Sequence, residues 1–190
     1  MFPFSFRLLC LVLLLPALAL AGNVDLVKAA RAQVGVTLIY DPAYRPLSYP
    51  GGDLPPARGV CTDVVIRALR TARSIDLQKQ VHEDMQAHFR AYPHGRNPAK
   101  PDANIDHRRV PNLMIWFTRA GYAVPRTHAA DDYLPGDIVA WALRPGVTHI
   151  GIVSDRHAAG GVPLIVHNIG AGAREEDILF RFNIIGHYRL

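Results

Sequence analysis

Cys61 is the residue of this sequence whose position best suits covalent chemistry. It opens a stretch, residues 61–73, in which apolar residues recur at helical spacing, so it stands at the start of a predicted helix. The thiolate is the attacking form of cysteine, and the unpaired N–H groups at a helix start favour that anion. The same N–H groups can stabilise the oxyanion that forms when a carbonyl is attacked. Position alone leaves two interpretations open, a nucleophile or a structural cysteine packed in the core.

His149 is the candidate base for this thiol. It stands near the start of an apolar strand predicted over residues 148–154, in which Ile150 and Ile152 alternate with Gly151. A histidine that activates a nucleophile is commonly oriented by a third polar group. His167 and Asn168 end the next predicted strand, and adjacent strand residues face opposite sides, so only one of them can serve. The strand register favours His167.

The elements that must position these side chains follow a simple order. Helical spacing predicts helices over residues 24–34, 61–73, 77–89 and 112–120. Apolar runs between turn signals predict a short strand at 37–40 and further strands over 137–143, 148–154, 164–169 and 178–189. A loop rich in proline and glycine, residues 41–59, precedes Cys61. Helices followed by an antiparallel meander indicate an α+β fold, in one domain over residues 22–190.

Residues 1–21 have the layout of a secretory signal peptide. Arg7 precedes an apolar run, and the small residues Ala19 and Ala21 predict cleavage after Ala21. An uncleaved anchor is the alternative, although the apolar run is short for a membrane span. We therefore expect a periplasmic or secreted protein without a stable membrane span. Cleavage removes Cys10 and leaves Cys61 as the one thiol, so no internal disulfide can form.

The composition, 49% hydrophobic and 19% charged with a net charge of +5, suits a globular domain with a sizeable core. The positive charge would draw an exported protein to anionic wall polymers, or it serves solubility alone. No basic stripe with interleaved aromatic residues is present, which argues against nucleic acid as a partner. Neither cysteine pairs nor an HExxH motif predict a metal site, so we expect no metal, no cofactor and a monomer.

Four segments resemble, in order and context, the motifs of NlpC-type cell-wall cysteine peptidases, a papain-like superfamily. They are Gly59-Val60-Cys61-Thr62-Asp63-Val64-Val65, Leu134-Pro135-Gly136-Asp137-Ile138-Val139, His149-Ile150-Gly151-Ile152-Val153 and Ile165-Val166-His167. The resemblance implies a reduced papain-like fold, with N-terminal helices packed on a C-terminal antiparallel sheet. It implies a Cys61–His149 pair with His167 or Asn168 as third residue, and an amide bond of peptidoglycan stem peptides, near D-glutamate and diaminopimelate, as the target. The sequence departs from the superfamily where Asp-Cys-Ser is replaced by Val60-Cys61-Thr62.

A bacterial exported family catalogued as a domain of unknown function is a closer match. The likeness covers nearly the whole mature chain and adds little about the substrate. It is carried by Tyr40-Asp41-Pro42-Ala43-Tyr44, Arg58-Gly59-Val60-Cys61-Thr62-Asp63, Val81-His82-Glu83-Asp84-Met85 and Asn104-Ile105-Asp106-His107-Arg108-Arg109-Val110-Pro111-Asn112-Leu113.

The substrate-binding candidates fall into two groups. The substrate-facing tyrosine of the NlpC-type superfamily matches Tyr49, with Tyr40 and Tyr44 as rivals. Asp63 is a further candidate that would instead cap the helix start. The charged cluster around Asp102 either clamps substrate carboxylates through its arginines or anchors a long loop. Its other members are Asp106, His107, Arg108 and Arg109.

Thiol-dependent amide hydrolysis is the function that these patterns predict. Two other classes stay open. One is an amidase or acyltransferase that acts on another amide or ester, and the other is a non-catalytic wall-binding module with a relic site.

Overall fold

The computed structural model describes residues 15–93 and 100–190. The predicted signal peptide, residues 1–21, lies mainly outside this range, and its described part forms the first turns of helix α1 (Leu15–Arg31). Cleavage after Ala21 therefore stays a prediction. Among the helices of the described range, none combines the length and the apolar character needed to cross a membrane.

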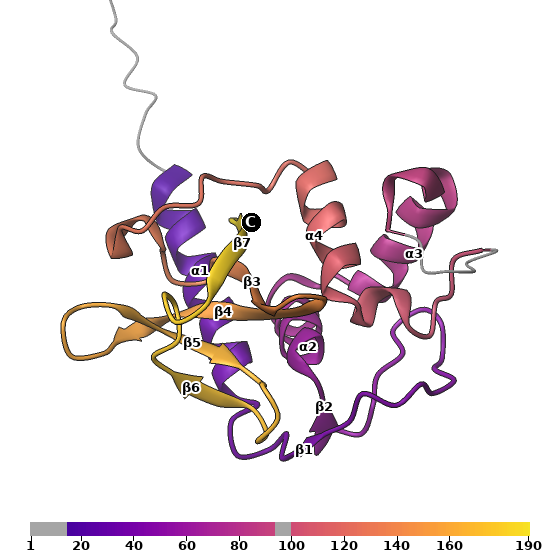
Figure 1. The fold of residues 1–190 in the computed structure, drawn as a ribbon, viewed down its shortest axis with the longest axis horizontal. Helices are drawn as coiled ribbons and strands as arrows, with labels where there is room; N and C mark the ends of the chain where they lie inside the picture. Colours follow the sequence, from indigo (N-terminus) through magenta and orange to yellow (C-terminus); the bar gives the residue numbers. More distant parts are fainter. Residues whose placement is uncertain (1–14, 94–99) are drawn as a thin grey trace, which may run out of the picture.

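Helix α2 (Cys61–Arg73) is the central helix, and its bounds match the prediction. Asp63 caps its first turn, because the carboxylate Oδ2 accepts a hydrogen bond of 2.7 Å from the Val60 amide. The helix ends at Ser74, which takes a left-handed conformation with φ of 55°. Helix α1 packs along α2 and against β4 and β5 (Figure 1).

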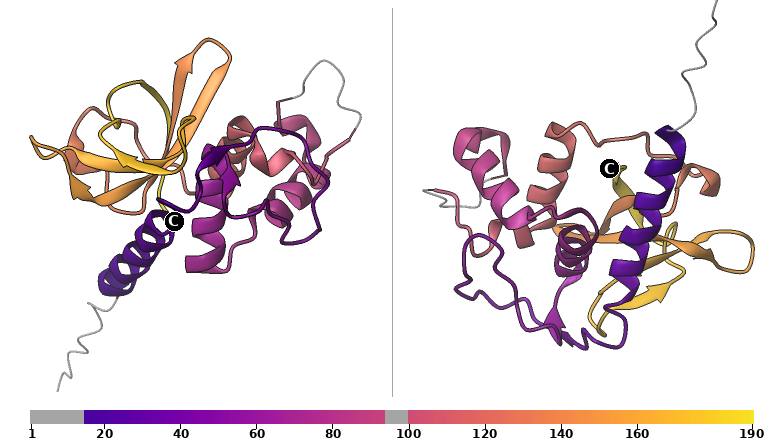
Figure 2. Two further views of the ribbon diagram at one scale, coloured as in Figure 1. Left: turned by 90° about the horizontal axis from the view of Figure 1, so that it is seen from below. Right: turned by 180° about the vertical axis from the view of Figure 1, so that it is seen from behind.

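The other two α-helices lie beside α2 (Figure 2), and the later of them also contacts the sheet. Helix α3 (Leu77–Ala87) is capped by Asp76 and stops short of the predicted end, where a 3-10 turn, η1 (Phe89–Ala91), takes over. A second 3-10 turn, η2 (Asp106–Arg108), leads into α4 (Val110–Arg119), which carries Pro111 in its first turn. A third, η3 (Ala130–Asp132), precedes the sheet.

The C-terminal part forms one antiparallel sheet in the order β6-β5-β4-β3-β7. Its strands are β3 (Ile138–Arg144), β4 (Val147–His157), β5 (Pro163–His167), β6 (Arg174–Glu176) and β7 (Asn183–Tyr188). Two short strands, β1 (Ile39–Tyr40) and β2 (Arg58–Gly59), form a separate parallel pair. They lie at the two ends of the loop that precedes α2. The predicted α+β class, with N-terminal helices on a C-terminal antiparallel sheet, is confirmed.

One strand prediction was wrong in detail, and one strand was missed. The stretch predicted as one strand over residues 178–189 is β-structure only in β7, because Ile178 and Leu179 turn inward and the Leu179 carbonyl accepts a hydrogen bond from the Trp141 indole at 2.9 Å. The short strand β6 was not predicted at all, since its three residues are charged and show no apolar alternation.

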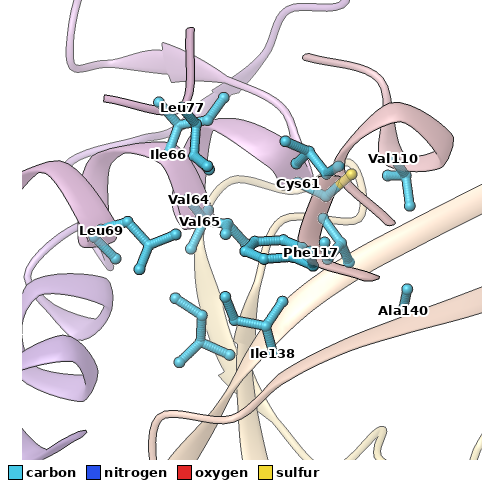
Figure 3. Close-up of a cluster of buried hydrophobic side chains, with 14 of the residues drawn as sticks. Cys61, Val64, Val65, Ile66, Leu69, Leu77, Val110, Phe117, Ile138 and Ala140 are labelled. Atoms are coloured by element: carbon cyan, nitrogen blue, oxygen red, sulfur yellow. The ribbon is translucent and has the colours of Figure 1, made fainter. Parts of the chain in front are cut away.

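The core has two parts, one on each face of the sheet. The larger part lies between the helices and the sheet, and Figure 3 shows Cys61 within it, beside Val64, Val65 and Phe117. The smaller part gathers Trp141, Tyr133 and their neighbours on the other face. Because β4 contributes Ile150 to the first part and Val153 to the second, this strand joins both.

Candidate active site

Cys61 lies at the first residue of α2 and is almost fully buried, with an exposed fraction of 5%. It lines a cavity of about 810 Å³ whose other walls come from β1, η1, η2, the start of α4 and the β3–β4 turn. In Figure 3 its sulfur points toward Val110 at the edge of the apolar cluster. Cys61 therefore lies at the wall of the cavity while its side chain is almost fully shielded from solvent.

The protonation of Cys61 departs from the expectation drawn from its helix position. Burial raises the pKa of the thiol to about 11, the Asp63 carboxylate adds to this, and the backbone amides of Ile150, Thr62 and Cys61 itself oppose it. Burial therefore outweighs the helix start. The resting thiol is neutral at pH 7 and needs a base when it attacks.

His149 sits on β4, next to the residue whose amide lowers the pKa of Cys61. Its Nε2 is 3.0 Å from Nδ1 of His167, and its ring lies 5.8 Å from the ring of Trp141. Burial, followed by the neighbouring His167, lowers the pKa of His149 to about 3, so the ring is neutral. Within the described residues, no hydrogen bond joins Cys61 to His149, and the strand register sets His149 opposite Trp141, on the face of the sheet that carries the smaller part of the core.

His167 and Asn168 make separate contacts. His167 is the hydrogen-bonding neighbour of His149, and its Nε2 reaches Glu176 at 3.1 Å. Asn168 instead donates to the Gly59 carbonyl at 3.0 Å and accepts from the Gly170 amide at 3.1 Å. Of the two alternatives, the contacts favour His167 as the orienting residue, and Asn168 ties the end of β5 to the segment that leads into Cys61.

Asp63 and Arg108 form a buried ion pair, and Arg108 also helps to line the cavity. Nη2 of Arg108 is 3.0 Å from Oδ2 of Asp63, and the two side chains are 2% and 4% exposed. Arg108 also donates to the carbonyl oxygens of Asp41 at 2.8 Å and Ala43 at 3.2 Å. With its donors engaged in this way, Arg108 anchors the loop, which supports the anchoring alternative over a substrate clamp at this position.

The rest of the charged cluster divides between the core and the cavity. His107 is buried and does not line the cavity. Its burial and the nearby Arg108 lower its pKa to about 4. Asp106 lines the cavity but accepts a hydrogen bond from the Asp102 amide, and burial raises its pKa. Arg109 is exposed, lines the cavity and makes no ion pair with any described residue. Among the described residues, Arg109 is thus the arginine of the cluster without an ion pair, and its charge opposes the rise in the pKa of Asp106.

The three candidate tyrosines lie at different places. Tyr40 lines the cavity with Cys61, and burial, with Cys61 and Asp63 nearby, raises its pKa. Tyr44 donates to Asp102 at 3.0 Å, and Tyr49 lies edge-on to His82 with ring centroids 5.2 Å apart. The structure therefore brings only Tyr40 of the three to the cavity that Cys61 lines.

Alkylation of Cys61 by iodoacetamide is expected to accelerate about tenfold for each pH unit between pH 7 and pH 10. The thiolate is the reactive species, and its fraction rises with pH up to the pKa of about 11. The measurement is the pseudo-first-order rate of modification of the Cys61 peptide, by mass spectrometry. A free cysteine peptide, with a pKa of about 8.5, is the reference and should level off earlier. A plateau of the Cys61 rate below pH 8 would instead indicate a resting thiolate–imidazolium pair.

Comparison with known proteins places the chain among relatives over most of its length. Residues 27–190 match the family described as "Domain of unknown function (DUF1287)". The chain is also similar to "Uncharacterized protein YijF" of Escherichia coli (strain K12), with 56% identity over 167 residues that cover 88% of this chain and 81% of that protein. No solved structure matches the chain.

Proposed function

This chain belongs to the DUF1287 family, and we propose that it is an exported cysteine hydrolase that cleaves an amide bond in peptidoglycan stem peptides. One observation carries the proposal. A buried cysteine, Cys61, stands at a helix start and lines a cavity of about 810 Å³. Strand β4, whose Ile150 amide interacts with the Cys61 sulfur, carries the neutral His149, which is hydrogen-bonded to His167. We assign to Cys61, His149 and His167 the parts of nucleophile, base and orienting group that covalent catalysis uses.

The reaction proceeds in two halves. Cys61 attacks the amide carbon while its proton passes to His149, and the backbone N–H of Cys61 stabilises the oxyanion. His149 then gives that proton to the leaving amine, so the C–N bond breaks and a thioester remains. In the second half, water attacks the thioester as His149 takes its proton, and the acid product leaves with the thiol restored. The sum is an amide and water converted to an acid and an amine, with no cofactor.

Two of the cationic side chains that line the cavity favour an anionic substrate. Arg109 and Lys100 line it, and neither forms an ion pair or a side-chain hydrogen bond with the described residues. The acids on the same wall are engaged within the protein, since Asp102 accepts from Tyr44 and Asp106 from the Asp102 amide. Stem peptides carry carboxylates that an exposed guanidinium can bind. The likeness to NlpC-type cell-wall peptidases supports the same substrate class.

The proposal is tested by digestion of purified sacculi with the mature chain, with released fragments identified by mass spectrometry. We expect new peptide fragments from the untreated protein and none from protein whose Cys61 has been alkylated. Absence of fragments from the untreated protein would contradict the peptidoglycan substrate and leave the amidase, acyltransferase or binding-module alternatives. Equal release by the alkylated protein would contradict Cys61 as the nucleophile.

A further inference from the structure

The hydrogen-bond chain that begins at His149 continues past His167 to an acidic residue on the edge strand β6. Nε2 of His167 lies 3.1 Å from Oε2 of Glu176, after the 3.0 Å step from His149 to His167. Strand β6 pairs with β5 so that Glu176 stands opposite Ile165, on the same face as His167. The other carboxylate oxygen, Oε1, is 3.7 Å from Arg174. One oxygen of Glu176 is therefore directed to the histidine chain and the other to the surface.

The proton positions along this chain follow from the acceptor at its end. An ionised carboxylate only accepts hydrogen bonds, so the proton of neutral His167 lies on Nε2, next to Glu176. Nδ1 of His167 is then a lone pair that accepts from Nε2–H of His149. A neutral His149 with its proton on Nε2 has a lone pair on Nδ1. This is the form in which a histidine can accept a thiol proton.

We propose that Glu176 is a positioning residue that fixes the tautomer of His167 and, through it, keeps Nδ1 of His149 unprotonated for Cys61. The proposal rests on the proposed function of Cys61 and His149. It adds a fourth member to the site, at the end of a hydrogen-bond chain that runs from β4 across β5 to β6. Without the carboxylate, neutral His167 is free to carry its proton on Nδ1. His149 must then accept on Nε2, and its own proton moves to Nδ1, which blocks the base.

The neighbouring acid, Glu175, offers a matched control. It lies on the same short strand but points to the opposite face, where Arg31 donates to it at 2.8 Å and Arg156 at 3.0 Å. It is as close to β5 as Glu176 is, because it stands opposite Val166. A purely structural role of acidic residues on β6 would affect both positions alike, whereas control of the tautomer belongs to Glu176 alone.

The test is ¹⁵N NMR of the histidine rings together with the rate of fragment release, in Glu176→Met, Glu176→Gln and Glu175→Gln. In the parent protein we expect protonated Nε2 and unprotonated Nδ1 at both His149 and His167. Glu176→Met is expected to show mixed tautomers at both rings and a loss of about 10- to 100-fold in rate, as for partners that orient a functional histidine elsewhere. In Glu176→Gln the amide oxygen can still accept a hydrogen bond, so its rate should lie between those of the parent protein and Glu176→Met. Glu175→Gln should keep the parent tautomers.

The outcomes distinguish a failure of the Glu176 role from a failure of the proposed hydrolase function. Parent-like tautomers in Glu176→Met, with an unchanged rate of a Cys61-dependent activity, would overturn the positioning role and leave the hydrolase standing. If Cys61 is not needed for fragment release, the proposed function fails, and the NMR spectra still decide whether Glu176 sets the tautomers. A shift of tautomers in Glu175→Gln equal to that in Glu176→Met would also overturn the proposal, because the effect would then belong to the strand as a whole.

Discussion

Replacement of Cys61 by alanine is expected to lower the rate of fragment release by a factor on the order of 10⁶, because no nucleophile is left to form the thioester. His149→Ala is expected to lose a comparable factor, since a thiol with a pKa of about 11 needs a base in place when it attacks. The double variant should be no slower than either single variant, because residues that act in one step are not additive. The measurement is the initial rate of release of soluble fragments.

A histidine elsewhere on the same strand supplies the control for this comparison. His157 ends β4 and is exposed, so His157→Ala removes an imidazole from β4 without touching the cavity. It should release fragments at the parent rate. If the losses of rate in the two single variants add in the double variant, Cys61 and His149 act in separate steps. A low rate in His157→Ala would show that any histidine substitution on β4 slows fragment release, whether or not it affects the Cys61–His149 pair.

The central helix and the histidine pair could be predicted from the sequence because their signals are local. Helix α2 combines an apolar stripe with an acid placed to cap it, and both mark the same first residue. The pairing of His149 with His167 follows from two apolar strands with a turn signal between them, which are adjacent in the sheet. In both cases the pattern that determines the local structure also determines the position of the candidate side chain.

Two other parts of the candidate site depend on tertiary structure, and no pattern in the sequence predicts them. Glu176 lies on a charged three-residue strand, where pairing with β5 and not apolar alternation makes the strand. Arg108 meets Asp63 across 45 residues of sequence, so neither spacing nor charge identifies the partner. The raised pKa of Cys61 is of the same kind, because it comes from burial under elements distant in sequence, which outweighs the helix start that the sequence does show.

Replacement of Arg108 by methionine is expected to lower the free energy of unfolding by about 3–5 kcal/mol, the cost of leaving one partner of a buried ion pair alone. Asp63 would stay buried without its cation, since the two side chains are 4% and 2% exposed in the pair. The carbonyl groups of Asp41 and Ala43 would lose a donor as well. Urea unfolding followed by circular dichroism gives the free energy. Typical domains have about 5–15 kcal/mol in total, so the loss is large.

An exposed ion pair serves as the control for this unfolding measurement. Lys79→Met removes an exposed ion pair with Glu83, at 3.9 Å, and should cost only about 0.3–0.5 kcal/mol. The double variant Asp63→Asn, Arg108→Met should recover part of the loss of Arg108→Met, because no unpaired charge is then buried. A loss in Arg108→Met no greater than in Lys79→Met would contradict a structural role for the pair.

The same ion pair connects the first turn of α2 to the η2 part of the cavity lining. Asp63 caps α2 two residues after Cys61, while Arg108 and Arg109 line the cavity and Arg108 donates to the carbonyl of Asp41, which follows Tyr40. We therefore expect Arg108→Met to slow fragment release even at temperatures where the variant stays folded, because the nucleophile and the cavity wall lose their common anchor. Parent-like rates in a folded but destabilised variant would show that the pair stabilises the fold without setting the geometry around Cys61.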